Sequence, residues 1–321
     1  MPILVLVEHA GGTPSDLSLQ AVTLARSLAA GEPIHALLLG AGGTEAAPAL
    51  GAFGVAVAHA GEHPGLDFFA PDAWAACLAQ LAERLLAGVV LAAASDRGAD
   101  VMARLAARQA LPLAANCSAA RPGLPMAVTR LRWGGSLLEE AVVHSDRPLL
   151  TVAAHAVAAD PAATAMTTEV RVFAPELEDR DLAVRVVEHV PAPGGGVSLK
   201  EAKVVVSGGR GVGSKEGFAI IEELAGLLGA AVGCSRAVTS AGWRPHTDQV
   251  GQTGTKIAPD VYIACGISGA TQHMAGCKAA KKILAINSDA DASIMANADY
   301  AVIGDLKEIL PAISDELRKR R

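Results

Sequence analysis

The chain reads Val261-Tyr-Ile-Ala-Cys-Gly-Ile-Ser-Gly-Ala-Thr-Gln-His273 in the stretch that decides its fold. Residues 261 to 264 form a short apolar run, which is typical of a buried parallel strand. The run ends at Gly266, passes Ser268 and Gly269, and enters a segment of helix-compatible composition from 270 to 280. The first N–H groups of a helix have no intrahelical partner and lie at its positive dipole end. A strand, a glycine turn and a helix start therefore predict a phosphate site.

The N-terminal half alternates strand-like and helix-like patterns. Apolar runs at 2–7, 33–39, 55–59 and 89–94 predict strands, and apolar residues at helical spacing predict helices at 16–29, 71–86 and 96–108. This alternation favours right-handed βαβ units and a parallel sheet. Beyond Leu111 we expect an antiparallel flap of meander-like strands at 127–133, 137–144 and 149–154, followed by short strands at 170–173 and 183–190.

A linker separates two domains in this interpretation. Its core is Pro191-Ala-Pro-Gly-Gly-Gly196, in which Pro gives stiffness and Gly gives freedom. The boundaries are residues 1–190 for an N-terminal parallel-sheet, nucleotide-binding-like α/β domain, 191–202 for the linker, and 203–321 for a C-terminal doubly wound domain. The second domain is expected to contain strands at 203–207, 230–234, 261–264, 282–286 and 300–302, helices at 215–228 and 306–319, and a long loop at 236–259.

Composition narrows the class of protein. The 321 residues are 51% hydrophobic and carry a formal charge of -6, which argues against a nucleic-acid partner. Five cysteines without a C-x-x-C pair indicate buried, reduced thiols in a cytoplasmic protein, with no metal or iron–sulfur site. No stretch is long and apolar enough for membrane insertion, and a strand that starts almost at residue 1 leaves no room for a targeting peptide.

Polar and glycine-rich segments follow several strands of the second domain. They are residues 208–211, 235–236, 266–273 and 287. Ligands of open parallel sheets bind beyond the carboxyl ends of the strands, so these segments predict one shared site. A full G-x-G-x-x-G fingerprint with its acidic partner is absent from the sequence, so the usual dinucleotide crossover is not indicated.

These segments, taken together and in order, resemble the C-terminal flavin domain of the electron transfer flavoprotein alpha-subunit family. The motifs that carry the resemblance are Val204-Val-Val-Ser-Gly-Gly-Arg-Gly211, Val232-Gly-Cys-Ser-Arg236, Val250-Gly-Gln-Thr253, the stretch quoted above, Ala285-Ile-Asn287, Ala298-Asp-Tyr300 and Gly304-Asp-Leu306. They cover about the last third of the chain, whereas the N-terminal part matches the family only in general architecture.

The resemblance implies FAD as the cofactor. It places Arg236 against the flavin ring, Thr253 by N5 and His273 by O2, as groups that tune the flavin. The positions that match the family's FAD contacts are Arg210, Ser235, Arg236, Val250, Gly251, Gln252, Thr253, Gly266, Ser268, Gly269, Ala270, Thr271, Gln272, His273, Asn287, Asp305 and Leu306. From the residue types alone, Arg210 and Ser268 suit a pyrophosphate, and Asn287 and Asp305 suit the adenosine end.

The resemblance also implies partners and a role. The N-terminal domain would dock on a beta subunit that holds AMP or a second flavin, forming a heterodimer. The chain would accept electrons from dehydrogenases such as the acyl-CoA dehydrogenases of fatty acid beta-oxidation, and pass them to a quinone oxidoreductase or another acceptor. It would be an electron carrier and not an enzyme, because no nucleophile–base pair stands out in the sequence.

Each candidate residue also has a purely structural interpretation. Arg236 could pair with Asp248 or Asp260, His273 could be a solvated side chain, and Asn287 is a natural turn former. As a set, these separate explanations become improbable, because all of them would have to hold at once.

Alternative functions stay open at this point. Within the family, the chain could serve an electron-bifurcating or nitrogen-fixation-linked complex. Related doubly wound domains occur in thiamine-diphosphate enzymes and deoxyhypusine synthase-like proteins, but a diphosphate–metal motif and a catalytic lysine setting are missing from the sequence. A nucleotide-binding module without a redox role is the third alternative, and the N-terminal half, which lacks a phosphate-loop signature, is expected to be structural and empty.

Overall fold

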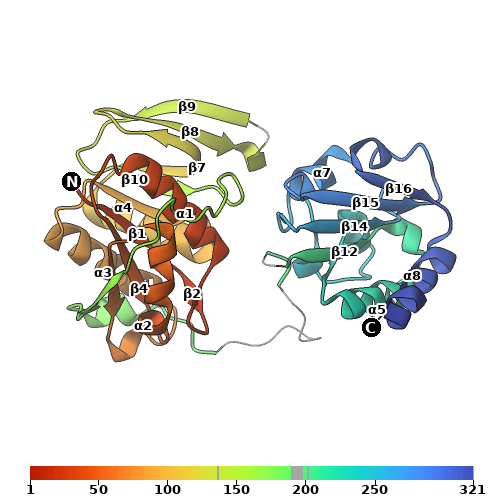
Figure 1. Cartoon of the computed structure of the whole chain (residues 1–321), viewed down its shortest axis with the longest axis horizontal. Coiled ribbons are helices and arrows are strands. Elements are labelled where there is room, and N and C mark those ends of the chain that lie inside the picture. The colour runs from red at the N-terminus through yellow and green to blue at the C-terminus, as the bar shows by residue number, and fades with distance from the viewer. Residues whose placement is uncertain (136, 189–197, 201, 321) are drawn as a thin grey trace. The chain divides into compact units, whose positions relative to one another are not determined.

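The protein consists of two compact units, Met1–His189 and Val190–Arg321, each with its own sheet (Figure 1). The computed structural model describes residues 1–135, 137–188, 198–200 and 202–320. Most of the predicted linker at 191–202, including its Pro191 to Gly196 core, lies outside the described residues.

The N-terminal unit is built on a nine-stranded sheet of order β11-β5-β4-β1-β6-β10-β7-β8-β9. Its strands are β1 (Ile3–Leu6), β4 (Ile34–Leu39), β5 (Val57–Gly61), β6 (Val89–Ala93), β7 (Leu113–Arg121), β8 (Met126–Arg132), β9 (Leu137–Val143), β10 (Leu149–Val152) and β11 (Glu169–Phe173), and a small hairpin joins β2 (His9–Ala10) to β3 (Thr13–Pro14). Neighbours from β11 to β7 pair in parallel, whereas β8 and β9 add antiparallel. The expected parallel sheet is confirmed.

Helices cover both faces of this sheet, because the central strands β1, β4 and β10 are buried at every position. Ile3 and Val5 of β1 pack with α1 (Asp16–Leu28) in one core, and Leu4 and Leu6 pack with α3 (Pro71–Arg84) and α4 (Asp96–Gln109) in the other. A short helix α2 (Gly43–Ala46) follows β4. Ser15 and Ser95 cap α1 and α4, since their hydroxyls accept from N–H groups of the first turn at 3.2 and 2.8 Å.

The predicted antiparallel flap is partly wrong. β8 and β9 form the flap as expected, but β10 lies inside the parallel sheet, between β6 and β7. The prediction missed β7 altogether. Alanine-rich strands have low intrinsic β propensity, and β7 is held by pairing on both sides, with Asn116 at a positive φ of 58° near its irregular register to β10.

The second predicted strand pair is half right. Residues 170–173 belong to β11, but residues 183–188 form no strand, and 189–190 lie outside the described residues. Val184 and Val187 are exposed there, and the backbone makes a single sheet-like contact, from Val186 N–H to Phe69 O at 2.8 Å. Apolar, β-branched residues alone do not make a strand without a neighbouring edge to pair with.

Two buried histidines give the N-terminal unit a pH dependence. His35 Nδ1 and His59 Nε2 lie 3.0 Å apart on neighbouring strands, beside Arg171 of β11. Burial, then the charges of His35 and Arg171, lower the pKa of His59 to about 4, and burial also lowers the pKa of His35. The folded state therefore binds fewer protons than the unfolded state between about pH 4 and the ordinary histidine pKa of about 6.5.

We expect the N-terminal unit to lose stability as the pH falls from 6.5 to 4, by up to about 1.4 kcal/mol per pH unit for each histidine involved. Tryptophan fluorescence during urea unfolding at pH 7 and pH 5 measures this in a Trp243→Phe background, which keeps only Trp74 and Trp133 of the N-terminal unit. A His59→Gln variant should show a shallower loss. Equal losses in both proteins would contradict the assignment to this pair.

The C-terminal unit holds a five-stranded, fully parallel sheet of order β13-β12-β14-β15-β16. The strands are β12 (Val204–Gly208), β13 (Ala231–Cys234), β14 (Val261–Cys265), β15 (Lys282–Asn287) and β16 (Tyr300–Ile303). The chain builds outward from β12 to β13, then returns to β14 on the other side. The order of strands therefore reverses between β12 and β14, where ligands of doubly wound sheets bind.

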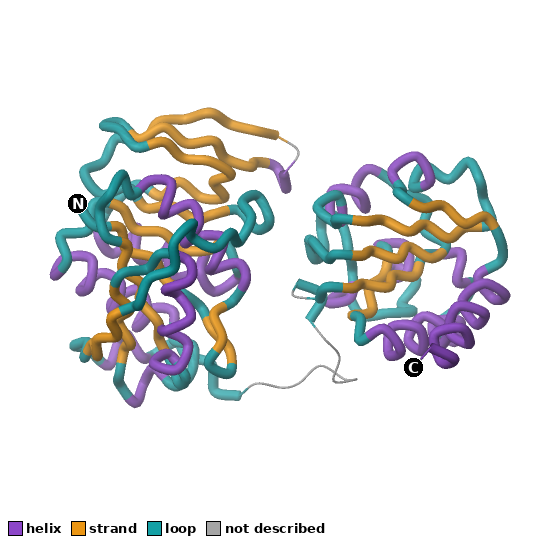
Figure 2. Tube along the Cα trace, in the orientation of Figure 1, coloured by secondary structure: helices purple, strands orange, loops and turns teal. Residues whose placement is uncertain are grey.

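Figure 2 shows this sheet between two layers of helices. Helices α5 (Ala219–Leu228) and α8 (Leu306–Arg320) pack on the face that carries Val206 and Ile263, and α7 (Thr271–Cys277) packs on the face that carries Val205 and Tyr262. The expected doubly wound fold is confirmed. The predicted loop at 236–259 is wrong in part, because it contains α6 (Arg236–Ser240) and a 3-10 turn at His246–Asp248.

All five cysteines are free and buried, as predicted from their spacing. Burial raises the pKa of the Cys265 and Cys277 thiols to about 12, so both are inert apolar filler beside the glycine turn. Across the described ranges, none of the helices has the length and apolar character needed to cross a membrane.

Candidate functional site

The segments that follow the parallel strands β12 and β14 pass so close to each other that only glycine fits between them. This close approach is the glycine crossing. Gly209 N–H donates to Cys265 O at 2.8 Å, and Gly211 N–H donates to Gly266 O at 3.1 Å. A Cβ on Gly209 would lie 2.1 Å from the Gly266 carbonyl oxygen, and Gly266 itself has a φ of 63°. Gly209 and Gly266 are buried in this contact, and Arg210 and Gly211 are exposed next to it, at the point where the strand order reverses.

The turn before α7 contains another position that requires glycine. Gly269 has a φ of 84°, and a Cβ there would lie 2.3 Å from Ile294 N. His273 and Met274 make the first backbone bonds of α7, both to Ala270 O, so the N–H groups of Thr271 and Gln272 come before the intrahelical ladder begins. Ser268 is exposed beside them, and its carbonyl accepts from Ile294 N–H at 3.0 Å. Hydrogen-bond donors thus collect where the sequence predicts a phosphate.

Two unpaired cations lie on the same edge of the sheet. Arg210 follows β12 and Arg236 follows β13, both are exposed, and neither forms an ion pair with any residue that the structure describes. The salt-bridge interpretation of Arg236 fails, because Asp248 pairs with Arg244 at 2.8 Å and Asp260 pairs with Lys281 at 2.7 Å. Unneutralised guanidinium groups next to free N–H donors suit an anionic ligand.

The segment Val250–Thr253 is held close to α7. Gln252 N–H donates to Gln272 O at 2.7 Å, and Val250 N–H donates to Cys234 O at 2.9 Å at the end of β13. Gly251 and Gly276 face each other so closely that a Cβ on Gly276 would lie 2.3 Å from Gly251 N. Ser235 N–H joins the same edge by donating to Gly208 O at 3.1 Å. The sequence motifs of β13, this segment and α7 therefore meet in one place.

A hollow of about 370 Å³ opens at the end of β13. It is lined by Arg236, Thr239, Ser240, His246, Gln249 and Thr253. The lining is polar, with one cation and several hydroxyl and amide groups. Such a lining suits a flat polar ring that offers hydrogen-bond acceptors along its edge.

His273 differs from its predicted surroundings. It is 7% exposed, and its Nε2 lies 2.7 Å from the hydroxyl of Tyr262, which is fully buried. Burial lowers the pKa of His273 to about 4, although the Val250 carbonyl opposes the shift, and burial raises the pKa of Tyr262. The solvated-histidine interpretation is wrong: His273 is a buried, neutral imidazole that is oriented by a tyrosine.

The polar side chains at the ends of β15 and β16 are largely engaged in hydrogen bonds within the protein. Asn287 donates from Nδ2 to Ile267 O at 3.1 Å and accepts from Asp289 N–H at 3.2 Å. Asp305 accepts from Lys307 N–H at 2.8 Å at the start of α8, and Leu306 is buried against the Gly266 turn. The turn-former interpretation of Asn287 therefore holds, and these residues shape the edge as well as facing it.

Sequence reasoning missed the roles of Gln249 and Tyr262. Tyr262 lies in an apolar strand run, where a tyrosine carries no sign of a buried partner. Gln249 is buried where the chain returns and forms an isolated β-bridge to Cys234. The sequence pattern does not predict this contact between distant segments. The Gly208–Gly211 run marked Gly209 as a turn residue, but only the crossing with β14 shows why it must be glycine.

The N-terminal unit offers no comparable anion site at its own strand-order reversal, between β1 and β6. There the Glu8 carboxylate accepts a hydrogen bond from the Ser95 hydroxyl, and Asp16 and Asp96 open α1 and α4. Negative charge and capped helix ends disfavour a phosphate.

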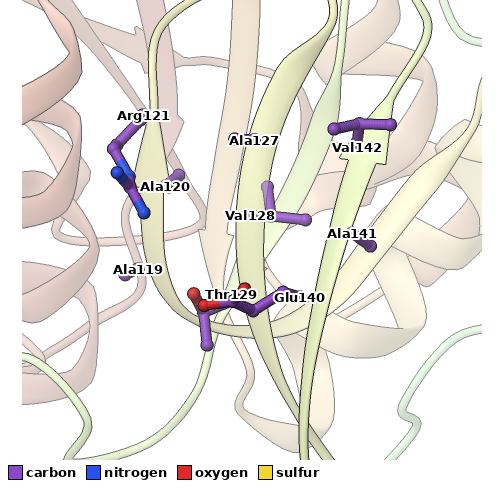
Figure 3. Close-up of a pocket in the computed structure, with 9 residues that line it drawn as sticks. All are labelled: Ala119, Ala120, Arg121, Ala127, Val128, Thr129, Glu140, Ala141 and Val142. Carbon is purple, nitrogen blue, oxygen red and sulfur yellow. The ribbon is translucent and has the colours of Figure 1, made fainter.

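A groove of about 320 Å³ on the flap is also a poor candidate. Figure 3 shows that small side chains such as Ala119 and Ala127 line it, with Arg121 and Glu140 as its only charged labelled residues. Few polar groups converge there, so it lacks the features of a specific small-molecule site.

The sheet and its glycine-lined carboxyl edge define a doubly wound nucleotide-binding domain, joined to a second α/β domain. The family model for the electron transfer flavoprotein FAD-binding domain matches residues 198–278, and the model for the electron transfer flavoprotein domain matches residues 3–178. The electron transfer flavoprotein subunit alpha of Mycobacterium leprae is 40% identical over 99% of this chain and 98% of that protein. The chain belongs to the electron transfer flavoprotein alpha-subunit family.

Other relatives span a wide range of organisms. The subunit alpha of Bacillus subtilis is 32% identical over 99% of this chain and 97% of that protein. Protein FixB of Clostridium saccharobutylicum is 34% identical over 97% of this chain and 94% of that protein. FAD is the cofactor of the C-terminal domain. The glycine crossing, the polar hollow and the two arginines that form no ion pair within the described ranges fit that cofactor.

Proposed function

We propose that this chain carries electrons as the FAD-binding half of a heterodimer with a beta subunit. It accepts them from dehydrogenases, such as the acyl-CoA dehydrogenases of fatty acid beta-oxidation, and passes them to a quinone oxidoreductase or another acceptor. The beta subunit docks on the N-terminal domain, and AMP or a second flavin belongs to that partner. The observation that carries the proposal is the carboxyl edge of the C-terminal sheet, where Arg210 and Arg236 are exposed and form no ion pair with a described residue, close to the glycine crossing and the start of α7.

We assign the pyrophosphate of FAD to the glycine crossing and the start of α7. Arg210 supplies charge, Ser268 supplies a hydroxyl, and the backbone of Gly269 to Gln272 supplies N–H groups. The pyrophosphate and ribityl chain of FAD would also contact the backbone of Ser235, Val250, Gly251, Gly266, Ala270 and Thr271. Asn287, Asp305 and Leu306 form the adenosine end, where Asn287 mainly fixes the loop that receives it.

The flavin ring is assigned to the hollow and its rim. FAD supplies reversible one-electron redox chemistry when it is bound. Arg236 contributes positive charge at the ring, Gln252 and Thr253 contribute hydrogen bonds, and His273 contributes a neutral ring nitrogen held by Tyr262. No substrate bond is made or broken in this role, so the chain acts as a carrier and not as an enzyme.

Anaerobic mixing tests the proposal. The chain is co-expressed with its beta subunit and mixed with an acyl-CoA dehydrogenase that has been reduced by its substrate. Loss of the oxidised-flavin absorbance on this chain within seconds is the expected result. Retention of that absorbance with every dehydrogenase tried, while dithionite still removes it, would contradict the donor assignment and leave FAD binding in place.

A bifurcating or nitrogen-fixation-linked role is the second candidate within the family. The similarity to Protein FixB, at 34% identity over nearly the whole chain, supports this second candidate role. The two roles differ in the partner. A beta subunit that brings a redox-active flavin of its own, and not AMP, would favour bifurcation.

A further inference from the structure

One side chain that lines the hollow at the end of β13 is almost fully buried. Gln249 is 2% exposed, and its amide joins two threonine hydroxyls. Thr239 Oγ1 on α6 donates to Gln249 Oε1 at 2.7 Å, and Gln249 Nε2 donates to Thr253 Oγ1 at 3.0 Å. The amide therefore sits between a helix that starts at Arg236 and the segment that carries Thr253.

In the structure, this chain of hydrogen bonds runs from the Thr239 hydroxyl through the Gln249 amide to the Thr253 hydroxyl. Bonds of the O–H···O type are commonly about 2.7–2.8 Å long, and N–H···O bonds about 2.9–3.0 Å. Thr239 Oγ1 lies 2.7 Å from Gln249 Oε1 and 3.0 Å from Arg236 O, and the shorter contact assigns its proton to the amide oxygen. Gln249 Nε2 then donates to Thr253 Oγ1 at 3.0 Å. A hydroxyl has one proton, so Thr253 accepts here and keeps its own proton for another acceptor.

The Thr253 side chain lies at the hollow. Thr253 is exposed and lines the hollow together with Arg236, whereas Gln249 closes it from the protein side. The backbone holds Gln249 firmly in this position, because Thr255 N–H donates to Gln249 O at 2.7 Å and Gln249 N–H donates to His246 O at 3.0 Å. These bonds fix the backbone of Gln249, and the two threonine hydroxyls hold its side-chain amide.

We propose that Gln249 is a positioning residue of the flavin site: its amide N–H occupies the Thr253 oxygen and so makes Thr253 a hydrogen-bond donor to the ring. The inference rests on the proposed assignment of the flavin ring to this hollow. A donor at the ring edge stabilises negative charge that reduction adds, so this orientation raises the flavin potential together with Arg236.

The test uses two substitutions of Gln249 in two backgrounds. Gln249→Glu replaces the N–H donor by an acceptor, so the Thr253 hydroxyl turns inward and donates to the carboxylate. Gln249→Met keeps the length, adds no charge and removes the hydrogen bond. Each is also made in a Thr253→Val background, which has no hydroxyl to orient. The midpoint potentials and the FAD content are measured on the complex with the beta subunit.

We expect Gln249→Glu to lower the ratio of one-electron-reduced to oxidised flavin at fixed potential, by a factor about tenfold larger with Thr253 than with Val at 253. A tenfold difference corresponds to about 59 mV for one electron. The added charge of the carboxylate acts in both backgrounds and cancels in this comparison. Gln249→Met should show a smaller loss, also confined to the Thr253 background, and it decides the question by itself if the Glu variant does not fold.

Equal effects in both backgrounds would overturn the role of Gln249 while leaving the flavin site intact. A wild-type complex that contains no flavin would instead overturn the proposed function on which the inference rests. The two failures are therefore distinguishable in the same set of samples.

Discussion

A Gly209→Ala variant is expected to retain no FAD and to have a clearly less stable C-terminal unit. The added Cβ would lie 2.1 Å from the Gly266 carbonyl oxygen and 2.8 Å from Ile267 Cα. Backbone atoms, and not a flexible side chain, would have to move, which costs about 3 kcal/mol or more. The movement would separate the ends of β12 and β14, where the pyrophosphate is assigned. Flavin absorbance after purification measures the loss.

Gly226→Ala is the matched control for this substitution. Gly226 lies within α5, and its added Cβ would have no neighbour within 4 Å. Alanine is favoured over glycine in a helix, so this variant should keep its FAD and gain about 0.5–1 kcal/mol of stability. Full flavin content in Gly209→Ala, equal to that of the control, would show that the glycine crossing does not form the binding surface.

Replacement of Arg236 is expected to give the largest change in flavin potential. Burial lowers the pKa of His273 to about 4, so Arg236 is the cation in the proposed ring site. Arg236→Ala should lower the midpoint potential of the first electron by about 60 mV or more, equal to about 1.4 kcal/mol. The shift should shrink at high salt, because Arg236 is exposed and ions screen its charge. Spectroscopic redox titration measures both effects.

Arg318 provides a matched control from the same domain. It lies near the end of α8, where it pairs with Glu223 and with Asp315. Arg318→Ala should leave the potential unchanged, and Arg236→Lys should keep most of it because the charge remains. Identical potentials for Arg236→Ala and Arg318→Ala would remove Arg236 from the ring site.

The order of strands and helices could be predicted from the sequence because each element carries its own period. The apolar run before Gly266 and the patterned helices α1, α3 and α4 were placed correctly by local signals alone. β7 could not be, since its alanines favour no strand by themselves and depend on pairing with β8 and β10. The position of β10 was wrong for the same reason: parallel or antiparallel pairing is decided by neighbours far away in sequence.

The candidate site shows the same division. Its glycines and arginines could be proposed because turn residues and polar groups follow predicted strands, whereas Gln252 and Thr253 were proposed from the family resemblance. The state of His273 could not, because its burial against Tyr262 depends on how α7 packs on β14. The role of the Gln249 amide could not be predicted for a similar reason. Its partners Thr239 and Thr253 come within reach only in the fold, where Gln249 forms a β-bridge to Cys234.

The central claim is that the C-terminal edge holds one FAD in a one-electron carrier. The most direct measurement is an absorbance spectrum of the chain co-purified with its beta subunit, followed by stepwise anaerobic reduction with dithionite. The account predicts flavin bands that correspond to one FAD per chain, and the spectrum of a one-electron-reduced, anionic flavin midway through the titration. A colourless complex that takes up no added FAD would contradict it.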